Sequence, residues 1–203
     1  DRYGEKDIVL YDESGSQIGT LPLEGEGIEG AGHVTGVFID GTDVYAESEH
    51  GPLVKVGTTS GTQGPRETVP GRPSRDGTLW LKAGITDALA GRTYVIANER
   101  PSGDHRFTRE LRVGSEVRSI VLLDSDLEGT IYFAAEVAEG ENDTIVLMTC
   151  LDPTTGAPTG SATLPANDMP EETFRDFVVL DGGGVIYAHR TESGTTYDHY
   201  DCE

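Results

Sequence analysis

Three carboxylates lie close together in the segment Asp124-Ser125-Asp126-Leu127-Glu128-Gly129. Oxygen-rich clusters of this kind bind Ca²⁺, and a glycine permits the sharp bend that such a loop needs. The segment is shorter than an EF-hand loop, so a solvated acidic hairpin turn is the alternative. We predict that Asp124, Asp126 and Glu128 form either a calcium site or such a turn, and we expect no other cofactor.

A cluster of arginines lies along one strand-like segment, at Arg106, Arg109 and Arg112, with Arg118 nearby. The alternation of side chains along a strand would divide these arginines between its two faces. The first three residues are candidates for a docking patch that receives an acidic ligand or a neighbouring acidic subunit. The alternative is internal charge balancing in a very acidic protein.

Histidines and cysteines offer two further kinds of site. His189 and His199 flank an expected hairpin and could face each other, but a metal would need a third ligand, so packed or surface histidines are the alternative. Cys150 and Cys202 each end a strand-like run and lack metal-ligand spacing. We predict a disulfide between them, as in proteins of oxidising compartments; two unpaired thiols are the alternative.

No familiar catalytic motif occurs in the sequence. Gly-x-Ser-x-Gly is absent, and no glycine-rich phosphate loop follows a strand. A pair of carboxylates could cleave a glycan, but 36 acidic residues give no basis for choosing two. We therefore assign no catalytic residue.

Charge excludes one large class of partner. The 203 residues contain 36 Asp and Glu against 15 Lys and Arg, for a formal net charge of -21. Such a surface repels a polyanion, so nucleic acid is not an expected partner. No apolar run is long enough for a membrane-spanning helix.

The elements that must position these residues are short strands. Apolar residues recur at period two or in short β-branched or aromatic runs, which is the pattern of strands rather than of amphipathic helices. Asp-Gly pairs at 40–41, 76–77 and 181–182 separate such runs and predict hairpins. The runs are 7–11, 34–39, 93–97, 119–123, 131–135, 144–148 and 177–180.

A repeat emerges when the turns are aligned. Each unit has an apolar strand, an Asp- or Gly-rich turn, an aliphatic-aromatic pair and a polar strand, with Tyr45, Trp80, Tyr132 and Tyr187 as aromatic anchors. We predict that these four residues occupy equivalent positions on the second strand of successive blades of a β-propeller.

The predicted fold is an all-β propeller of about four or five blades, with a β-sandwich as the alternative. We expect one domain over residues 1–203, with an outer hairpin at 1–24 and a terminal blade at 174–203. The two chain ends could complete one blade together, or the chain could be part of a larger propeller.

The segment Leu151-Asp152-Pro153-Thr154-Thr155-Gly156 resembles the outer turn of quinoprotein-type propeller repeats. That family carries a Trp at the end of nearly every repeat, whereas Trp80 lies elsewhere, so the resemblance implies no quinone cofactor. Asp43-Val44-Tyr45, Glu49-His50-Gly51 and Ala188-His189-Arg190-Thr191-Glu192 are similar to uncharacterised secreted proteins of gliding bacteria. That similarity implies export but no activity.

These observations together predict a non-catalytic binding or scaffold module that is secreted, periplasmic or on the cell surface. Its expected partner is a protein or a glycan, within a larger protein or assembly. The alternative is a carboxylate-dependent glycan hydrolase or lyase that acts at the propeller channel.

Overall fold

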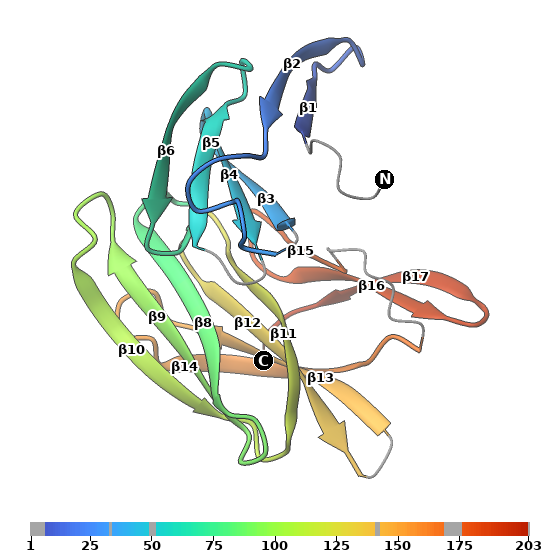
Figure 1. Ribbon diagram of the computed structural model, residues 1–203. Coiled ribbons are helices and arrows are strands. Elements are labelled where there is room, and N and C mark those ends of the chain that lie inside the picture. Colours follow the sequence, from blue (N-terminus) through green and yellow to red (C-terminus); the bar gives the residue numbers. More distant parts are fainter. Residues whose placement is uncertain (1–6, 33, 49–51, 141–142, 169–175, 203) are drawn as a thin grey trace. The chain divides into compact units, whose positions relative to one another are not determined.

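The computed structural model describes residues 7–32, 34–48, 52–140, 143–168 and 176–202 (Figure 1). Within these ranges all regular secondary structure is β-strand, and the strands form five antiparallel sheets. No helix in the described ranges is long and apolar enough to cross a membrane. The chain divides into two compact units, Asp1–Arg72 and Pro73–Glu203.

The first unit contains a hairpin and a four-stranded sheet. The hairpin lies within the expected range 1–24, and Leu21 from it is fully buried beside Val44, Val54 and Val56 of the sheet. Arg66 donates hydrogen bonds to the carbonyls of Pro22 and Val56. The strands are β1 (Asp7–Tyr11) and β2 (Gln17–Pro22), then β3 (Val34–Asp40), β4 (Asp43–Ser48), β5 (Leu53–Thr58) and β6 (Gln63–Val69).

The second unit contains three sheets in which consecutive strands are neighbours. The first is β7 (Arg72–Pro73, at the boundary), β8 (Leu79–Asp87), β9 (Arg92–Glu99) and β10 (His105–Arg112). The second is β11 (Val117–Ser125), β12 (Ile131–Glu139), β13 (Asp143–Leu151) and β14 (Pro158–Pro165). The third is β15 (Phe177–Val179), β16 (Val185–Thr191) and β17 (Gly194–Tyr200), within the expected terminal blade.

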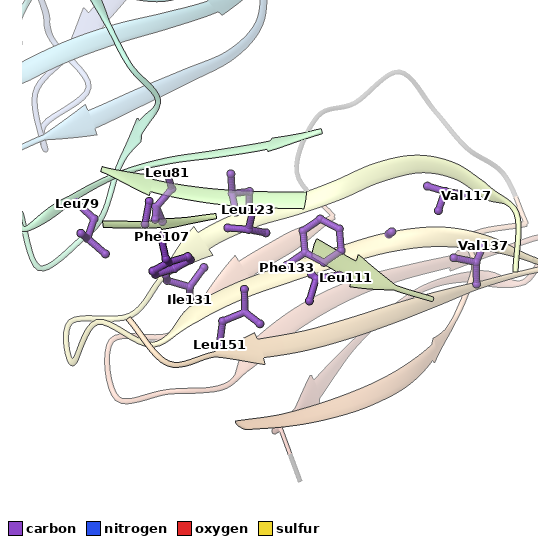
Figure 2. Close-up of a cluster of buried hydrophobic side chains, with 13 residues drawn as sticks. Leu79, Leu81, Phe107, Leu111, Val117, Leu123, Ile131, Phe133, Val137 and Leu151 are labelled. Atoms are coloured by element: carbon purple, nitrogen blue, oxygen red, sulfur yellow. The ribbon is translucent and has the colours of Figure 1, made fainter. Parts of the chain in front are cut away.

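The middle sheet, β11 to β14, buries both of its faces. Phe133 and Ile131 on β12 join a cluster with Leu79 and Phe107 of the preceding sheet (Figure 2). Tyr132, between them on the strand, points the other way and joins a cluster with Tyr187 of the following sheet. Sheets that stack in chain order differ from the two sheets of a sandwich and correspond to propeller blades. The predicted all-β, propeller-type fold is confirmed.

The expected hairpin turns are present. Asp40-Gly41 joins β3 to β4, Asp76-Gly77 joins β7 to β8, and Asp181-Gly182 joins β15 to β16. Gly41 has φ 57° and Gly77 has φ 76°, a region that only glycine enters without strain. These turns therefore fix where the chain reverses direction between the paired strands.

The four aromatic anchors occupy the second strand of their sheets and are all buried, but they are not equivalent. Tyr132 points toward the following sheet, whereas Tyr187 points back toward the same cluster from the facing sheet. Leu79 and Leu81 face the second sheet of this unit, so Trp80, which lies between them on β8, points to the other face of its sheet. The aligned repeat is thus wrong by one residue at some blades, and a one-residue shift moves a side chain to the other face.

The disulfide between Cys150 and Cys202 is confirmed, with 6.1 Å between the Cα atoms, within the usual range. Cys150 lies on β13 and Cys202 follows β17, so the bond links the second and third sheets. Gly160 makes room for it, because a Cβ there would lie 2.9 Å from the Cβ of Cys202.

Candidate functional site

The predicted calcium residues form a capped turn between β11 and β12. Asp126 is only 2% exposed, and its Oδ1 accepts hydrogen bonds from the N–H groups of Glu128, at 3.0 Å, and Thr130, at 2.9 Å. Asp124 lies at the end of β11 and Glu128 is exposed. The described residues contain no group of three or more His, Cys, Asp or Glu that could hold a metal. Calcium binding at these residues stays a prediction.

The Tyr132 hydroxyl links Asp126 to the turn between β15 and β16. The Tyr132 hydroxyl donates to Asp126 Oδ2, at 3.1 Å, and accepts from the N–H of Gly184, at 2.9 Å. Burial, and then the nearby Asp126 carboxylate, raise the pKa of the Tyr132 hydroxyl, although the Gly184 bond opposes them. The phenol therefore remains a neutral donor, and its two hydrogen bonds join the buried carboxylate to Gly184.

Arg75 directly precedes the Asp76-Gly77 turn, and it joins all three sheets of the second unit. Its N–H donates to Ser125 Oγ at 2.9 Å, and Nη1 donates to the Val179 carbonyl at 2.6 Å. Its Nη2 also forms an ion pair with Asp181. No sequence pattern signals this role, because its partners lie about fifty and one hundred residues away.

Two of the predicted docking arginines hold a neighbouring turn. Arg106 pairs bidentately with Glu99, at 2.7 and 2.8 Å, and its Nη1 donates to the Pro153 carbonyl. Arg109 donates to the carbonyls of Gly156, at 2.9 Å, and Thr155, at 3.2 Å. Hydrogen bonds from Arg106 hold the pKa of Glu99 below its ordinary value. These two side chains support the β13–β14 turn, and their role in docking a partner stays a prediction.

Asp152 caps that same turn. Its Oδ1 accepts hydrogen bonds from the Thr155 hydroxyl and from the N–H groups of Thr154 and Thr155. The Thr155 hydroxyl and N–H bonds lower the pKa of Asp152. The turn is therefore fixed by its own aspartate and by the two arginines of β10.

Arg112, the third docking residue, remains 70% exposed and pairs with Glu110 at 3.0 Å. It lines a groove of about 650 Å³ between β10 and β14. The groove combines two arginines, one glutamate and three hydroxyl side chains with apolar residues. Its lining comprises Arg109, Glu110, Leu111, Arg112, Val113, Thr149, Pro158, Thr159, Gly160 and Ser161. Such a surface can bind a ligand by hydrogen bonds and charge.

The histidine pair is not assembled. The strand register places His199 opposite Ile186 and His189 opposite Thr196, so the two rings do not face each other. His189 Nε2 instead lies 3.2 Å from the Ala166 carbonyl. The hypothesis of a zinc site between these two histidines is therefore wrong.

A polar cluster that the sequence did not indicate lies beside His189. Arg190 Nη2 forms an ion pair with Asp176 Oδ1 at 2.6 Å. Asn167 donates to Asp176 Oδ2 and accepts the N–H of Arg190, both at 2.7 Å. Burial is the largest cause that raises the pKa of Tyr187, and the negative charges of Asp176 and then Glu136 add to it. These contacts join the β14–β15 connection to β16.

Comparison with known proteins identifies a fold but no family. No family model matches the chain, and no curated protein matches it. The expected resemblance to quinoprotein repeats or to secreted proteins of gliding bacteria is therefore unsupported, and Glu49-His50-Gly51 lies outside the described residues.

Solved structures do match. A candidate 6-phosphogluconolactonase from Bacteroides uniformis ATCC 8492 is 15% identical, with a TM-score of 0.51, over 98% of this chain and 78% of that one. A second from Bacteroides fragilis NCTC 9343 is also 15% identical, with a TM-score of 0.45, over 97% of this chain and 63% of that one. At this identity the first likeness shows the fold alone, which is that of propeller-type proteins.

Proposed function

We propose that the chain is a non-catalytic binding module that works outside the cytoplasm and engages a protein or glycan partner. The groove between β10 and β14 carries this proposal, because it gathers charged, hydroxyl and apolar groups on one open surface. Binding sites typically place a few polar groups within an apolar surface in this way.

The disulfide supports the location. Cys150 and Cys202 are bonded, and disulfides persist in oxidising compartments such as the periplasm, the cell surface and the exterior. The bond crosses between two sheets, so it acts on the packing of the fold rather than on a loop. A secreted, periplasmic or cell-surface location follows from this proposal.

Four of the described carboxylates serve the structure. A carboxylic acid that donates a proton near neutral pH needs a raised pKa. The resolved shifts of described carboxyl groups run the other way, because hydrogen bonds lower the pKa of Asp12, Glu99 and Asp152. Burial opposes the shift at Asp76, but the hydrogen bonds from Ser74 and Thr78 outweigh it and lower the pKa. These groups act as hydrogen-bond acceptors that stabilise turns and strand pairs.

An enzyme that acts on a sugar derivative is the second candidate. The likeness in fold to a candidate 6-phosphogluconolactonase favours it. A carboxylate-dependent glycan hydrolase or lyase belongs to the same class of alternatives. In that case Asp176, beside Arg190 and Tyr187, would be the first carboxylate to test.

Turnover and binding assays distinguish the two candidates. The whole chain is incubated with 6-phosphogluconolactone and with a panel of polysaccharides, and is also applied to a glycan array and to extracellular protein fractions. We expect binding without turnover. Ser161→Trp should remove binding by filling the groove, whereas Thr163→Trp, at an exposed position on the same strand outside the groove lining, should not. Saturable turnover that Asp176→Asn removes would contradict the proposal.

A further inference from the structure

The groove between β10 and β14 lies along strand edges. Its lining includes the consecutive residues 109–113 from the end of β10 and 158–161 from β14. Because neighbouring side chains on a strand point to opposite faces, a groove over one face would be lined by every second residue. Consecutive residues on both sides indicate that a ligand meets the backbone edges as well as the side chains.

β10 is the better of the two edges for pairing. β10 and β14 are the outer strands of their sheets, so each pairs with one neighbour in its sheet. An edge strand leaves half of its N–H and C=O groups available along its outer side. Pro158 and Pro165 end β14 and lack N–H groups, whereas β10 contains no proline.

The charges along β10 select an acidic ligand. Arg109 donates to two main-chain carbonyls, which are neutral and do not cancel its charge. Arg112 is 70% exposed, and Glu110 is its partner. The groove therefore carries an excess of positive charge in a chain whose net charge is -21. Opposite charges across paired strands are favourable, and like charges are not.

We propose that the groove binds an extended acidic peptide segment of a partner protein, which adds a strand to the outer edge of β10. This inference rests on the proposed binding function and names its partner. Main-chain hydrogen bonds would supply affinity. Arg109 and Arg112 lie on opposite faces of β10, so an acidic side chain on either face of the added strand would meet one of them, which would supply specificity. The interaction has the chemistry of strand addition rather than of binding to one side-chain pocket.

Fluorescence anisotropy with labelled peptides tests the proposal. The probes are a short peptide of alternating Glu and Val and its counterpart of alternating Lys and Val. We expect the Glu peptide to bind and the Lys peptide not to bind. Arg112→Gln should weaken binding roughly two- to fivefold. Arg118→Gln is the matched control, because Arg118 is also exposed and also pairs with a glutamate two residues earlier, yet lies outside the groove lining.

N-methylation of the Glu peptide tests strand pairing directly. An added strand turns only every second N–H toward β10, so methylation of one alternate set should abolish binding and methylation of the other should not. Equal effects of the two sets, equal binding of the Lys peptide, or equal losses with Arg112→Gln and Arg118→Gln would overturn the proposal. A glycan that binds the groove while the peptides do not would overturn it but leave the binding function intact, whereas turnover would overturn the binding function itself.

Discussion

The two interfaces between sheets in the second unit are closed by different chemistry. Between the first and second sheets, arginines of β10 donate to the carbonyls of the β13–β14 turn. Between the second and third sheets, the Cys150–Cys202 disulfide forms the outer link. The first interface joins two four-stranded sheets, whereas the second joins a four-stranded sheet to one of three strands. The covalent link therefore occurs at the interface with the smaller sheet.

The cores of the two interfaces also differ. The first is mostly aliphatic around Phe107 and Phe133 (Figure 2). The second is built on Tyr187, whose ring stacks on Phe177 with centroids 4.6 Å apart. The first interface therefore depends on the packing of apolar side chains, and the second adds phenols and a covalent bond. Variants at each interface should separate these contributions.

Phe133→Ala should have the largest effect. Phe133 is fully buried in the middle of the first interface, and truncation of a buried phenylalanine costs about 3–5 kcal/mol through lost transfer energy and the cavity left behind. Urea denaturation measures the change in the free energy of unfolding. Val178→Ala, at an exposed site, is the control and should change it by less than about 0.5 kcal/mol. A similar loss from both variants would show that the apolar core does not hold this interface.

Removal of the disulfide should come next. The bond closes a chain segment of 52 residues, and a loop of this size predicts about 2–4 kcal/mol of stabilisation. The Cys150→Ser, Cys202→Ser double variant should lower the free energy of unfolding by that amount. Reductant should lower the stability of the parent chain and leave the double variant unchanged. An unchanged parent in reductant, with both thiols shown to be free, would mean that the second interface does not need its covalent link.

The strands and turns of these interfaces could be predicted because their causes are local. The runs at 131–135 and 144–148 have strand periodicity, and each lies within the observed β12 or β13. β6 gave no such signal, because its sequence Gln63–Val69 is polar and contains a proline, as suits an outer strand. The disulfide could be predicted from the number of cysteines and their positions at strand ends.

The faces of the strands and the distant contacts could not be predicted. Tyr132 and Tyr187 share one cluster although they point in opposite directions along the series of sheets, and alignment of turns does not reveal this. The docking arginines were identified, but the carbonyl partners of Arg106 and Arg109 lie 46 or 47 residues away. Such partners depend on how sheets stack, which no local pattern contains.

Arg106→Ala should have a moderate effect on the first interface. The variant loses the bidentate pair with Glu99 and the bond to the Pro153 carbonyl. Hydrogen bonds to charged groups contribute about 1.5–3 kcal/mol when buried, and this side chain is partly exposed, so we expect a loss of about 1–2 kcal/mol. Arg112→Ala, at an exposed pair, should cost less than about 0.5 kcal/mol in the same urea titration. Equal losses would remove the distinction between the arginines that hold the turn and the exposed Arg112.

Alkaline pH should weaken the second interface. Burial, and then the nearby Asp176 carboxylate, raise the pKa of Tyr187 well above its ordinary value. A raised pKa means that the unfolded chain loses this proton first, so the stabilising contribution is complete below about pH 10 and is lost as pH rises beyond it. Tyr187→Phe removes this proton, so its free energy of unfolding should fall less steeply above about pH 10 than that of the parent. Parallel pH curves for the two chains would contradict this assignment.

Acid pH should weaken the first interface, by the smallest of these effects. The pKa of Glu99 is lowered first by its hydrogen bond from Arg106, and that of Asp152 first by its hydrogen bond from the Thr155 hydroxyl. When the folded pKa is lowered, the unfolded chain binds protons first, so the stabilising contribution is complete above about pH 4–5 and is lost as pH falls through the folded pKa. Both carboxylates are open to solvent, which screens them, so the loss should be small and should diminish at high salt.

Many other carboxylates titrate in the same range, and the difference in the free energy of unfolding between the parent and Glu99→Gln isolates the contribution of Glu99. That difference should be present at neutral pH and shrink toward pH 3, whereas Glu110→Gln, at the exposed pair with Arg112, should give a smaller difference at neutral pH. If Glu99→Gln matched the parent at neutral pH, the Glu99–Arg106 pair would contribute nothing to the first interface, and its stability would depend on the apolar core and the bonds from the arginines to the turn carbonyls alone.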